Sequence, residues 1–238
     1  ARNILRQCEQ AQMAVHNAGN VLSGQVSIGL APGTSASSLV MPLLREIRET
    51  WPDILVYLHE NSGHALNEKV INGQLDMALL YDRTPEKGLN CQPLMQEELY
   101  LVGTGVSPGA QIDLSEVAGM NLYLPRDYSA VRQRVDEAFS LRRLSAHIIG
   151  EIESLSTLSA AISSGMGVSV LPESAAKSLT APINGWMSKI ISPSLHLPLT
   201  LNTSSALPMS ASARAVQQCL LALTQRSVIT ERELMLVS

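Results

Sequence analysis

Hydroxyl side chains crowd the start of one expected helix, and charged and hydroxyl side chains occupy two loops further along the chain. The first group, at 34–38, contains four hydroxyls at a place where free backbone N–H groups and the helix dipole favour an anion or a polar ligand. Capping explains any single one of these hydroxyls, but one helix start does not need four. The candidate binding residues of these regions are Thr34, Ser35, Pro125, Arg126, Ser129, Glu153 and Ser154.

Glu153 sets the expected charge of this candidate site. A carboxylate at the mouth of a cleft repels an anionic ligand unless a cation neutralises it, and Arg126 in the neighbouring loop is the candidate cation. If these two charges pair, they favour a closed form without any ligand. The sequence therefore leaves open whether a small-molecule effector exists, and it favours one that is absent, cationic or weakly bound.

Enzymatic and metal sites find little support in the sequence. His59 and His64 are five residues apart, which on a helix separates them by about 140° instead of placing both on one face. Gly165 and Gly167 precede an expected strand, whereas a dinucleotide site needs its glycines after one, and Val170 stands where a third glycine should be. No Gly-x-Ser-x-Gly nucleophile motif occurs. We therefore expect a protein without catalytic residues, metal or cofactor.

The elements that position the candidate site follow one order twice: strand, helix, strand, helix, strand. The expected strands lie at 25–30, 54–59, 75–80, 120–124, 147–152 and 168–171. The first expected helix carries Leu39, Leu43 and Ile47 on one face, and further helices are expected at 65–71, 129–143 and 154–164. The helix at 65–71 is closed by Asn72 with Gly73, and the helix at 154–164 by Gly165 with Gly167. This alternation predicts an α/β fold of two Rossmann-like subdomains with parallel strands, and a cleft between them.

Two extended segments connect the expected subdomains. The chain crosses outward at 94–102 and returns at 197–202, and a helix that begins after Ser210 is expected to pack on the first subdomain. Adjacent crossover strands form a natural hinge. The predicted organisation is a linker helix at 1–23, subdomain I at 24–97 and 203–238, and subdomain II at 98–202. The tail at 228–238 has no assignment.

A further helix is expected before the first strand. Its apolar positions recur at alternating steps of four and three, as in a coiled coil: Ile4, Cys8, Ala11, Val15, Ala18 and Leu22. This seam predicts a dimer. The alternative is a single amphipathic helix packed on its own domain, because about three heptads fit either arrangement.

Composition limits the possible partners. The 238 residues are 45% hydrophobic and 3% aromatic, with a net charge of -4, so this stretch has no electrostatic reason to hold nucleic acid or an anionic membrane by itself. Three dispersed cysteines favour a reduced, cytoplasmic protein, and no apolar run approaches the roughly 20 residues that span a bilayer. Because the chain begins with Ala1, we expect a further N-terminal portion.

Several short motifs, in order, resemble those of the LysR-type transcriptional regulators. They are the opening at 24–29, Pro42-Leu43-Leu44, Trp51-Pro52-Asp53, the run at 73–78 and the run at 164–172. The resemblance implies a type 2 periplasmic-binding-protein-like fold and a winged helix-turn-helix before Ala1 that contacts DNA. It also implies a dimer that becomes a tetramer at full length, contact with RNA polymerase, and activation or repression of genes.

The same resemblance bears on the site and on the regulated genes. Members of the family that respond to small molecules hold organic acids with hydroxyl side chains, whereas here Pro125 and Glu153 stand near positions where those members often offer a hydroxyl. The stretches at 57–63, 135–144 and 185–188 resemble a member that controls nitrogen assimilation genes. The alternative function is a periplasmic solute-binding receptor of a transporter, which shares the fold; a signal peptide before Ala1 favours the receptor and a helix-turn-helix favours the regulator.

Overall fold

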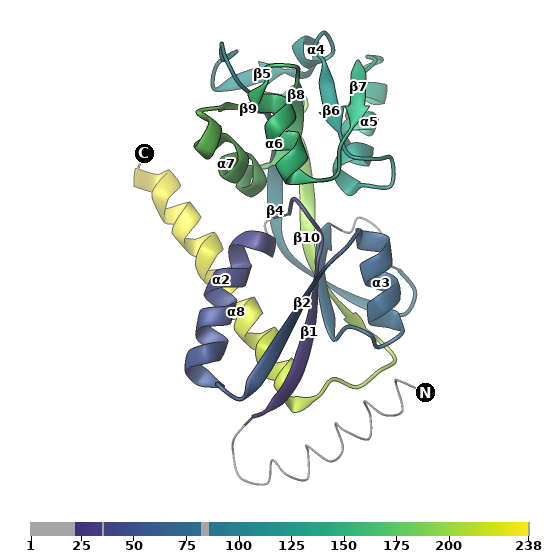
Figure 1. Ribbon diagram of the computed structural model, residues 1–238, viewed down its shortest axis with the longest axis vertical. Helices are drawn as coiled ribbons and strands as arrows, with labels where there is room; N and C mark the ends of the chain where they lie inside the picture. Colours follow the sequence, from purple (N-terminus) through teal and green to yellow (C-terminus); the bar gives the residue numbers. More distant parts are fainter. Residues whose placement is uncertain (1–21, 35, 82–85, 238) are drawn as a thin grey trace.

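The computed structural model describes residues 22–34, 36–81 and 86–237, and it contains two stacked α/β halves (Figure 1). The strands form the order β2-β1-β3-β10-β4-β8-β6-β7, with β9 beside β4 and β5 beside β9. We refer to the part that contains β1, β2 and β3 as the first half, and to the part that contains β6, β7 and β8 as the second half.

The first half contains the parallel strands β1 (Gly24–Leu30), β2 (Ile54–Glu60) and β3 (Met77–Tyr81), as its alternation of elements predicted. One face of the sheet packs against α2 (Ala36–Thr50) and α8 (Ala211–Val237), and the other face packs against α3 (Gly63–Ile71). The predicted helix face is confirmed, because Leu39, Leu43 and Ile47 are all buried.

The second half repeats this arrangement with β6 (Leu122–Leu124), β7 (Ile148–Glu151) and β8 (Val168–Pro172), which are parallel. Its first face is covered by α4 (Leu114–Val117) and α5 (Ala130–Leu141), and its second by α6 (Leu155–Ser163) and α7 (Glu173–Thr180). Smaller elements complete it: β5 (Gln111–Asp113), the 3-10 helix η1 (Ala181–Ile183) and β9 (Trp186–Ile191).

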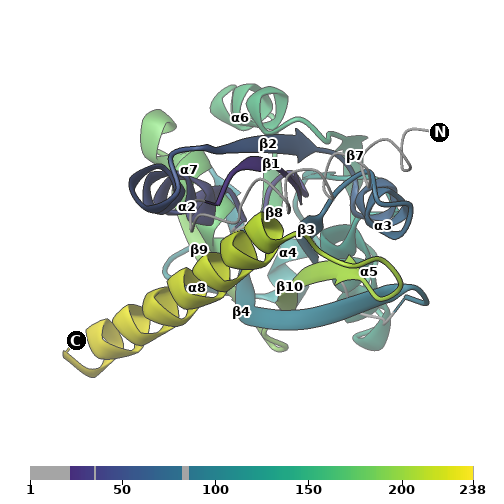
Figure 2. The same ribbon diagram turned by 90° about the horizontal axis from the view of Figure 1, so that it is seen from below.

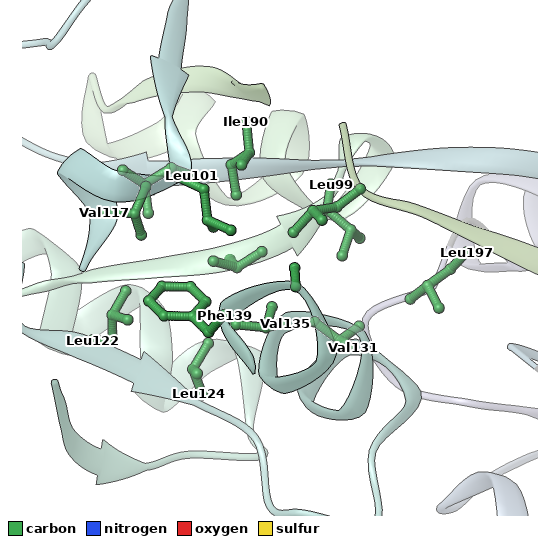
Figure 3. Packing of buried hydrophobic residues seen from close by; sticks show 14 of the residues in the cluster. Leu99, Leu101, Val117, Leu122, Leu124, Val131, Val135, Phe139, Ile190 and Leu197 are labelled. Carbon is green, nitrogen blue, oxygen red and sulfur yellow. The ribbon is translucent and has the colours of Figure 1, made fainter. Parts of the chain in front are cut away.

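Phe139 of α5, the one phenylalanine of the sequence, packs among aliphatic side chains of β4 and β6 (Figure 3). The same cluster continues into the connection between the halves, because it also contains Leu39 of α2, Tyr81 of β3 and Leu197 of β10. The two halves therefore share one continuous apolar core at their junction.

Two long antiparallel strands, β4 (Leu89–Gly103) and β10 (His196–Ser204), join the halves, as the crossover pattern predicted. From Leu89 to Glu98, β4 pairs with β10, and from Leu99 it pairs with β8 instead. Near residue 98 the chain thus passes from one half to the other.

The structure corrects the expected roles of two residues at helix ends. Gly73 and Gly165 have positive φ angles of 66° and 72°, so each ends its helix in the left-handed conformation. Asn72 has a φ of −82° and does not share that role. Gly167 has no left-handed angle; a side chain there would lie 2.7 Å from the carbonyl oxygen of Asn121, so its glycine is required by close packing.

The ends of the chain also differ from expectation. Leu22 and Ser23 are not helical, and Leu22 packs against the first-half core, so the predicted linker helix does not extend through 23. The other predicted seam residues, Ile4 to Ala18, lie outside the described residues. The unassigned tail continues α8 as far as Val237, and this helix projects from the body of the molecule (Figure 2). Within the described part of the chain, no helix is both long and apolar enough to cross a membrane.

Candidate functional site

A cavity of about 600 Å³ lies between the two halves. Residues that follow strands or begin helices line it, because the carboxyl ends of β1, β2, β3 and β6 meet at this level. Its lining consists of Ala31, Pro32, Thr34, Asn61, Ser62, Gly63, His64, Asn67, Leu80, Tyr81, Glu86, Pro125, Tyr128, Ser129, Ala130, Val131, Gln133 and Glu153.

The first-half wall holds its polar side chains by hydrogen bonds within the protein. The hydroxyl of Thr34 donates to the carbonyl oxygen of Ala31 at 2.8 Å and accepts from the backbone N–H of Ala36 at 3.3 Å. Only 3% of Thr34 is exposed. This hydroxyl therefore stabilises the turn before α2. A structural role of this kind was the expectation for any single hydroxyl at 34–38.

Asn67 is the buried amide of the same wall. Its carbonyl oxygen accepts from Nδ2 of Asn202 in β10 at 2.9 Å, and its own Nδ2 donates to Oε2 of Glu86 at 2.8 Å. Because Asn202 is 135 residues away in the sequence, this bond also fixes α3 against a crossover strand. Asn67 is 5% exposed, so the wall at this point is rigid.

Two helices begin at the cavity, one from each half. Ser62 is the N-cap residue of α3 and Ser129 is that of α5, and neither side chain forms a capping hydrogen bond. The first N–H groups of both helices are therefore not satisfied by their own N-cap side chains. Such helix starts favour a carboxylate or another hydrogen-bond acceptor.

The second-half wall presents an exposed pair of polar side chains. The hydroxyl of Tyr128 donates to Oε1 of Glu153, and 50% of Tyr128 is exposed. Arg126 instead lies 3.9 Å from Glu151 and faces the ring of Tyr128 at 5.9 Å from the ring centroid. The ion pair between Arg126 and Glu153 that the sequence suggested is therefore not formed. Glu151 in β7 lies closer to the guanidinium, and Tyr128 bonds to Glu153.

Four of the sequence-predicted site residues line the cavity: Thr34, Pro125, Ser129 and Glu153. Arg126 and Ser154 are absent from its lining. Ser154 is the N-cap of α6, where its hydroxyl accepts from the N–H of Thr157, so it stabilises the start of that helix. Ser35 lies outside the described residues.

Sequence reasoning missed the buried groups of the first-half wall, above all Asn67 and Tyr81. Tyr81 could have been found, because it ends β3, and the carboxyl ends of parallel strands were expected to border the cleft. Asn67 gave no such signal. Its position within α3 becomes meaningful only when β10 returns beside that helix.

Among the described residues that line the cavity, acidic side chains outnumber basic ones. Its lining contains the carboxylates of Glu86 and Glu153 together with His64, and it contains no lysine or arginine among the described residues. Among those residues there is also no group of three or more His, Cys, Asp or Glu side chains that could hold a metal ion. The cavity therefore offers carboxylates for an ammonium group and two helix starts for a carboxylate.

Comparisons with known proteins give a consistent result. Residues 19–225 match the family model described as the LysR substrate binding domain. The whole chain is 61% identical to the nitrogen assimilation regulatory protein nac of Klebsiella aerogenes and 59% identical to the protein of the same name in Escherichia coli K12, and it spans 78% of the length of each. A solved effector-binding domain of QuiR in complex with shikimate matches 86% of this chain, and 99% of its own length, with a TM-score of 0.77 at 20% identity.

Proposed function

Since the chain belongs to the LysR-type transcriptional regulators, we propose that it regulates nitrogen assimilation genes and that the cavity between its halves is the regulatory site. The chain contains the effector-binding domain of such a regulator. Its relatives in Klebsiella aerogenes and Escherichia coli carry nitrogen assimilation in their names, and they share about three fifths of its residues over its full length. The alternative function, a solute receptor for a transporter, is not favoured.

The observation that carries the regulatory site is the cavity itself. It lies between the halves at the level of two crossover strands, so a molecule bound there contacts both halves at once. A ligand that contacts both halves stabilises the arrangement that brings its contacts together. We therefore propose that occupancy of this cavity adjusts the angle between the halves.

The charges of the lining favour an ammonium-bearing ligand over a dicarboxylate. Glu86 and Glu153 supply negative charge, and no lysine or arginine of the described lining offsets it. The backbone N–H groups at the starts of α3 and α5 can donate to one carboxylate. The ligand that best matches this lining is a zwitterion or a cation of modest size. This agrees with the expectation that Glu153 makes the cavity a poor site for anions.

Three four-carbon probes separate these possibilities, because their ends carry two carboxylates, one carboxylate and one ammonium, or two ammonium groups: succinate, 4-aminobutyrate and 1,4-diaminobutane. Each is added to the 238-residue protein and to Glu153→Thr, and the shift in melting temperature is recorded, since a ligand of the folded state stabilises it. We expect 4-aminobutyrate or the diamine to produce the larger shift in the wild type. Glu153→Thr should raise the shift with succinate and lower that with the diamine.

A matched control is Glu46→Thr, which removes an exposed carboxylate whose ion-pair partner is Arg226, far from the cavity lining. It should leave the order of the three probes unchanged. A larger shift with succinate than with either amine in the wild type would contradict the ligand class. Absence of any shift with all three probes up to millimolar concentration would contradict a small-molecule regulatory site.

LysR-type regulators act as oligomers that bind DNA, and we propose that this protein dimerises through the seam at residues 4–18. At full length we propose a tetramer, with DNA contacted by a winged helix-turn-helix and with RNA polymerase as a further partner. We also propose that it acts in the cytoplasm and without a catalytic step. The proposal rests on the heptad spacing of the seam and on the resemblance to the family.

Sedimentation of the 238-residue protein tests the seam. Ala11→Arg with Val15→Arg should shift the assembly toward monomer at low micromolar concentration, because it places two charges in the predicted contact. The control is Met13→Arg with Asn17→Arg, which has the same charge and spacing but lies off the seam. Equal sedimentation of the two double variants would contradict the seam. Specific promoter binding by the 238-residue protein alone would contradict the proposal that a separate domain contacts DNA.

A further inference from the structure

A buried carboxylate lies at the junction of the two halves. Glu97 belongs to β4, one residue before the point where this strand changes partners, and only 7% of it is exposed. Its Oε2 accepts from the hydroxyl of Tyr81, and its Oε1 accepts from the hydroxyl of Ser174 at 2.6 Å and from the N–H of Ser174 at 3.2 Å. One carboxylate therefore bonds to both halves of the molecule.

The contact on the first-half side begins at the cavity. Tyr81 lines the cavity from the end of β3, and its hydroxyl crosses β10 to reach β4. The register explains this reach, since Tyr81 is opposite Leu199 in β10, and Leu197, two residues earlier, is opposite Glu97. Tyr81 is 8% exposed, so its hydroxyl has few alternative partners in solvent.

The contact on the second-half side is a helix cap supplied by another element. Pro172 occupies the N-cap position of α7 and makes no side-chain capping bond. The carboxylate of Glu97 instead accepts from the N–H of Ser174 in the first turn, where the positive end of the helix dipole also favours a negative charge. Glu97 thereby stabilises the start of α7 from 77 residues away.

We infer that Tyr81, Glu97 and Ser174 couple the wall of the cavity to helix α7, with Tyr81 and Glu97 acting as positioning residues of the regulatory site. A ligand or substitution that breaks the hydrogen bond from the Tyr81 hydroxyl to Glu97 also affects the cap of α7. The reason is that the carboxylate of Glu97 accepts both from Tyr81 and from Ser174. Because coupling between two sites is reciprocal, a change at the cavity alters the order at the start of α7, and a change at the start of α7 alters the cavity wall. This inference rests on the proposed function only in assigning the cavity to an effector.

Hydrogen exchange in the 238-residue protein measures the coupling without any ligand. Tyr81→Phe removes the hydroxyl and keeps the ring, so a local effect would be confined to β3 and its neighbours. We expect the amides of α7, at 173–180, to exchange about threefold to tenfold faster than in the wild type, since hydrogen bonds to charged groups contribute on the order of a tenfold change in an equilibrium constant. Tyr57→Phe is the control, because it removes an exposed hydroxyl of β2 that contacts only His59 among the hydrogen bonds described.

Further variants keep the test decisive. Glu97→Gln should accelerate exchange in α7 more than Tyr81→Phe does, whereas Glu98→Gln should not, because the neighbouring carboxylate pairs with Lys189 instead. Ser174→Ala and Tyr81→Phe combined should accelerate exchange by less than the product of their separate effects, since both act through Glu97. Wild-type exchange of α7 in Tyr81→Phe, or strictly multiplicative effects in the double variant, would overturn the inference.

Addition of 4-aminobutyrate separates this inference from the proposed function. If the probe binds, it should alter exchange in α7 in the wild type, and in Tyr81→Phe that change should shrink by at least half. If the probe fails to bind while Tyr81→Phe still accelerates exchange in α7, the coupling holds and the proposed ligand class is wrong. Should the probe bind and change α7 equally in both proteins, Tyr81 does not carry the coupling.

Discussion

Three polar side chains of the first-half wall are buried and bonded within the protein, whereas a polar pair of the second-half wall is open to solvent. Thr34, Asn67 and Tyr81 are each less than 9% exposed and bond to backbone or to crossover strands, while Tyr128 is 50% exposed and bonds to the neighbouring Glu153. The two halves repeat one arrangement of strands and helices. Their difference teaches that a repeated scaffold can supply one wall whose polar groups are fixed by internal hydrogen bonds and one whose polar groups remain open to solvent.

The largest expected effect separates the two walls by stability. Asn67→Ala removes bonds to Asn202 and Glu86 and leaves a buried amide without this partner, so we expect a loss of about 2–3 kcal/mol in the free energy of unfolding. Glu153→Ala removes only an exposed contact and should change it by less than about 0.5 kcal/mol. Urea denaturation of both variants measures the difference. Similar losses would break the distinction between the walls.

Glycines test how far the two halves are alike away from the cavity. Gly73→Ala and Gly165→Ala, at corresponding helix ends, should each cost about 1 kcal/mol, because both φ angles are positive. Gly167→Ala should cost more, about 1–3 kcal/mol, since its side chain would meet the carbonyl oxygen of Asn121 at 2.7 Å. Melting temperatures give the ranking. If Gly167→Ala is the mildest of the three, close packing at that residue is not what requires glycine.

The two serines that begin second-half helices allow a finer comparison. Ser154→Ala removes the side-chain cap of α6 and should cost about 0.5–1 kcal/mol, whereas Ser129→Ala removes no capping bond and should cost less than about 0.5 kcal/mol. Thermal denaturation under identical conditions measures both. A larger loss for Ser129→Ala would mean that this hydroxyl stabilises the cavity wall by another contact.

The smallest expected effect is confined to alkaline pH. Burial, assisted by Glu173 and Glu98, raises the pKa of Tyr100 to about 12 from its ordinary value of 10.0. Because the folded state holds this proton more tightly, the resulting stability is present below pH 10 and is lost as the pH rises through about 12. Tyr100→Phe should therefore flatten the decline of the free energy of unfolding in this range, and Tyr57→Phe, on the exposed edge strand of the first half, should not. An unchanged slope in Tyr100→Phe would contradict the raised pKa.

Local patterns in the sequence predicted the repeated elements well. Apolar runs placed the strands, which helices cover on both faces, and apolar periodicity placed the helices, which have one buried face. Glycines marked the helix ends at 73 and 165. The pattern did not predict α7 or β9, and it left the tail at 228–238 unassigned although α8 runs through it as far as Val237. These elements gave weaker signals, since α7 begins directly after β8 without a loop.

The site was predicted only in part, for a physical reason. Pro125, Ser129 and Glu153 were found because residues near strand ends and helix starts border such clefts. Glu97 and Asn67 were missed, since each derives its role from a strand that is distant in sequence and adjacent in space. Glu97 stands between Gln96 and Glu98, so the sequence does not show which of these polar side chains is buried. A buried carboxylate needs a partner, and the sequence does not say which one.

The partner exchange in β4 also bears on protein engineering. Glu98 is paired directly with His196, and every residue of the second half lies between these two positions in the sequence. The second half is thus topologically an insertion into a hairpin. A chain in which a two-residue turn joins Glu98 to His196 would retain the adjacency β2-β1-β3-β10-β4, so the domain could be excised or exchanged without cutting any other strand of the first half.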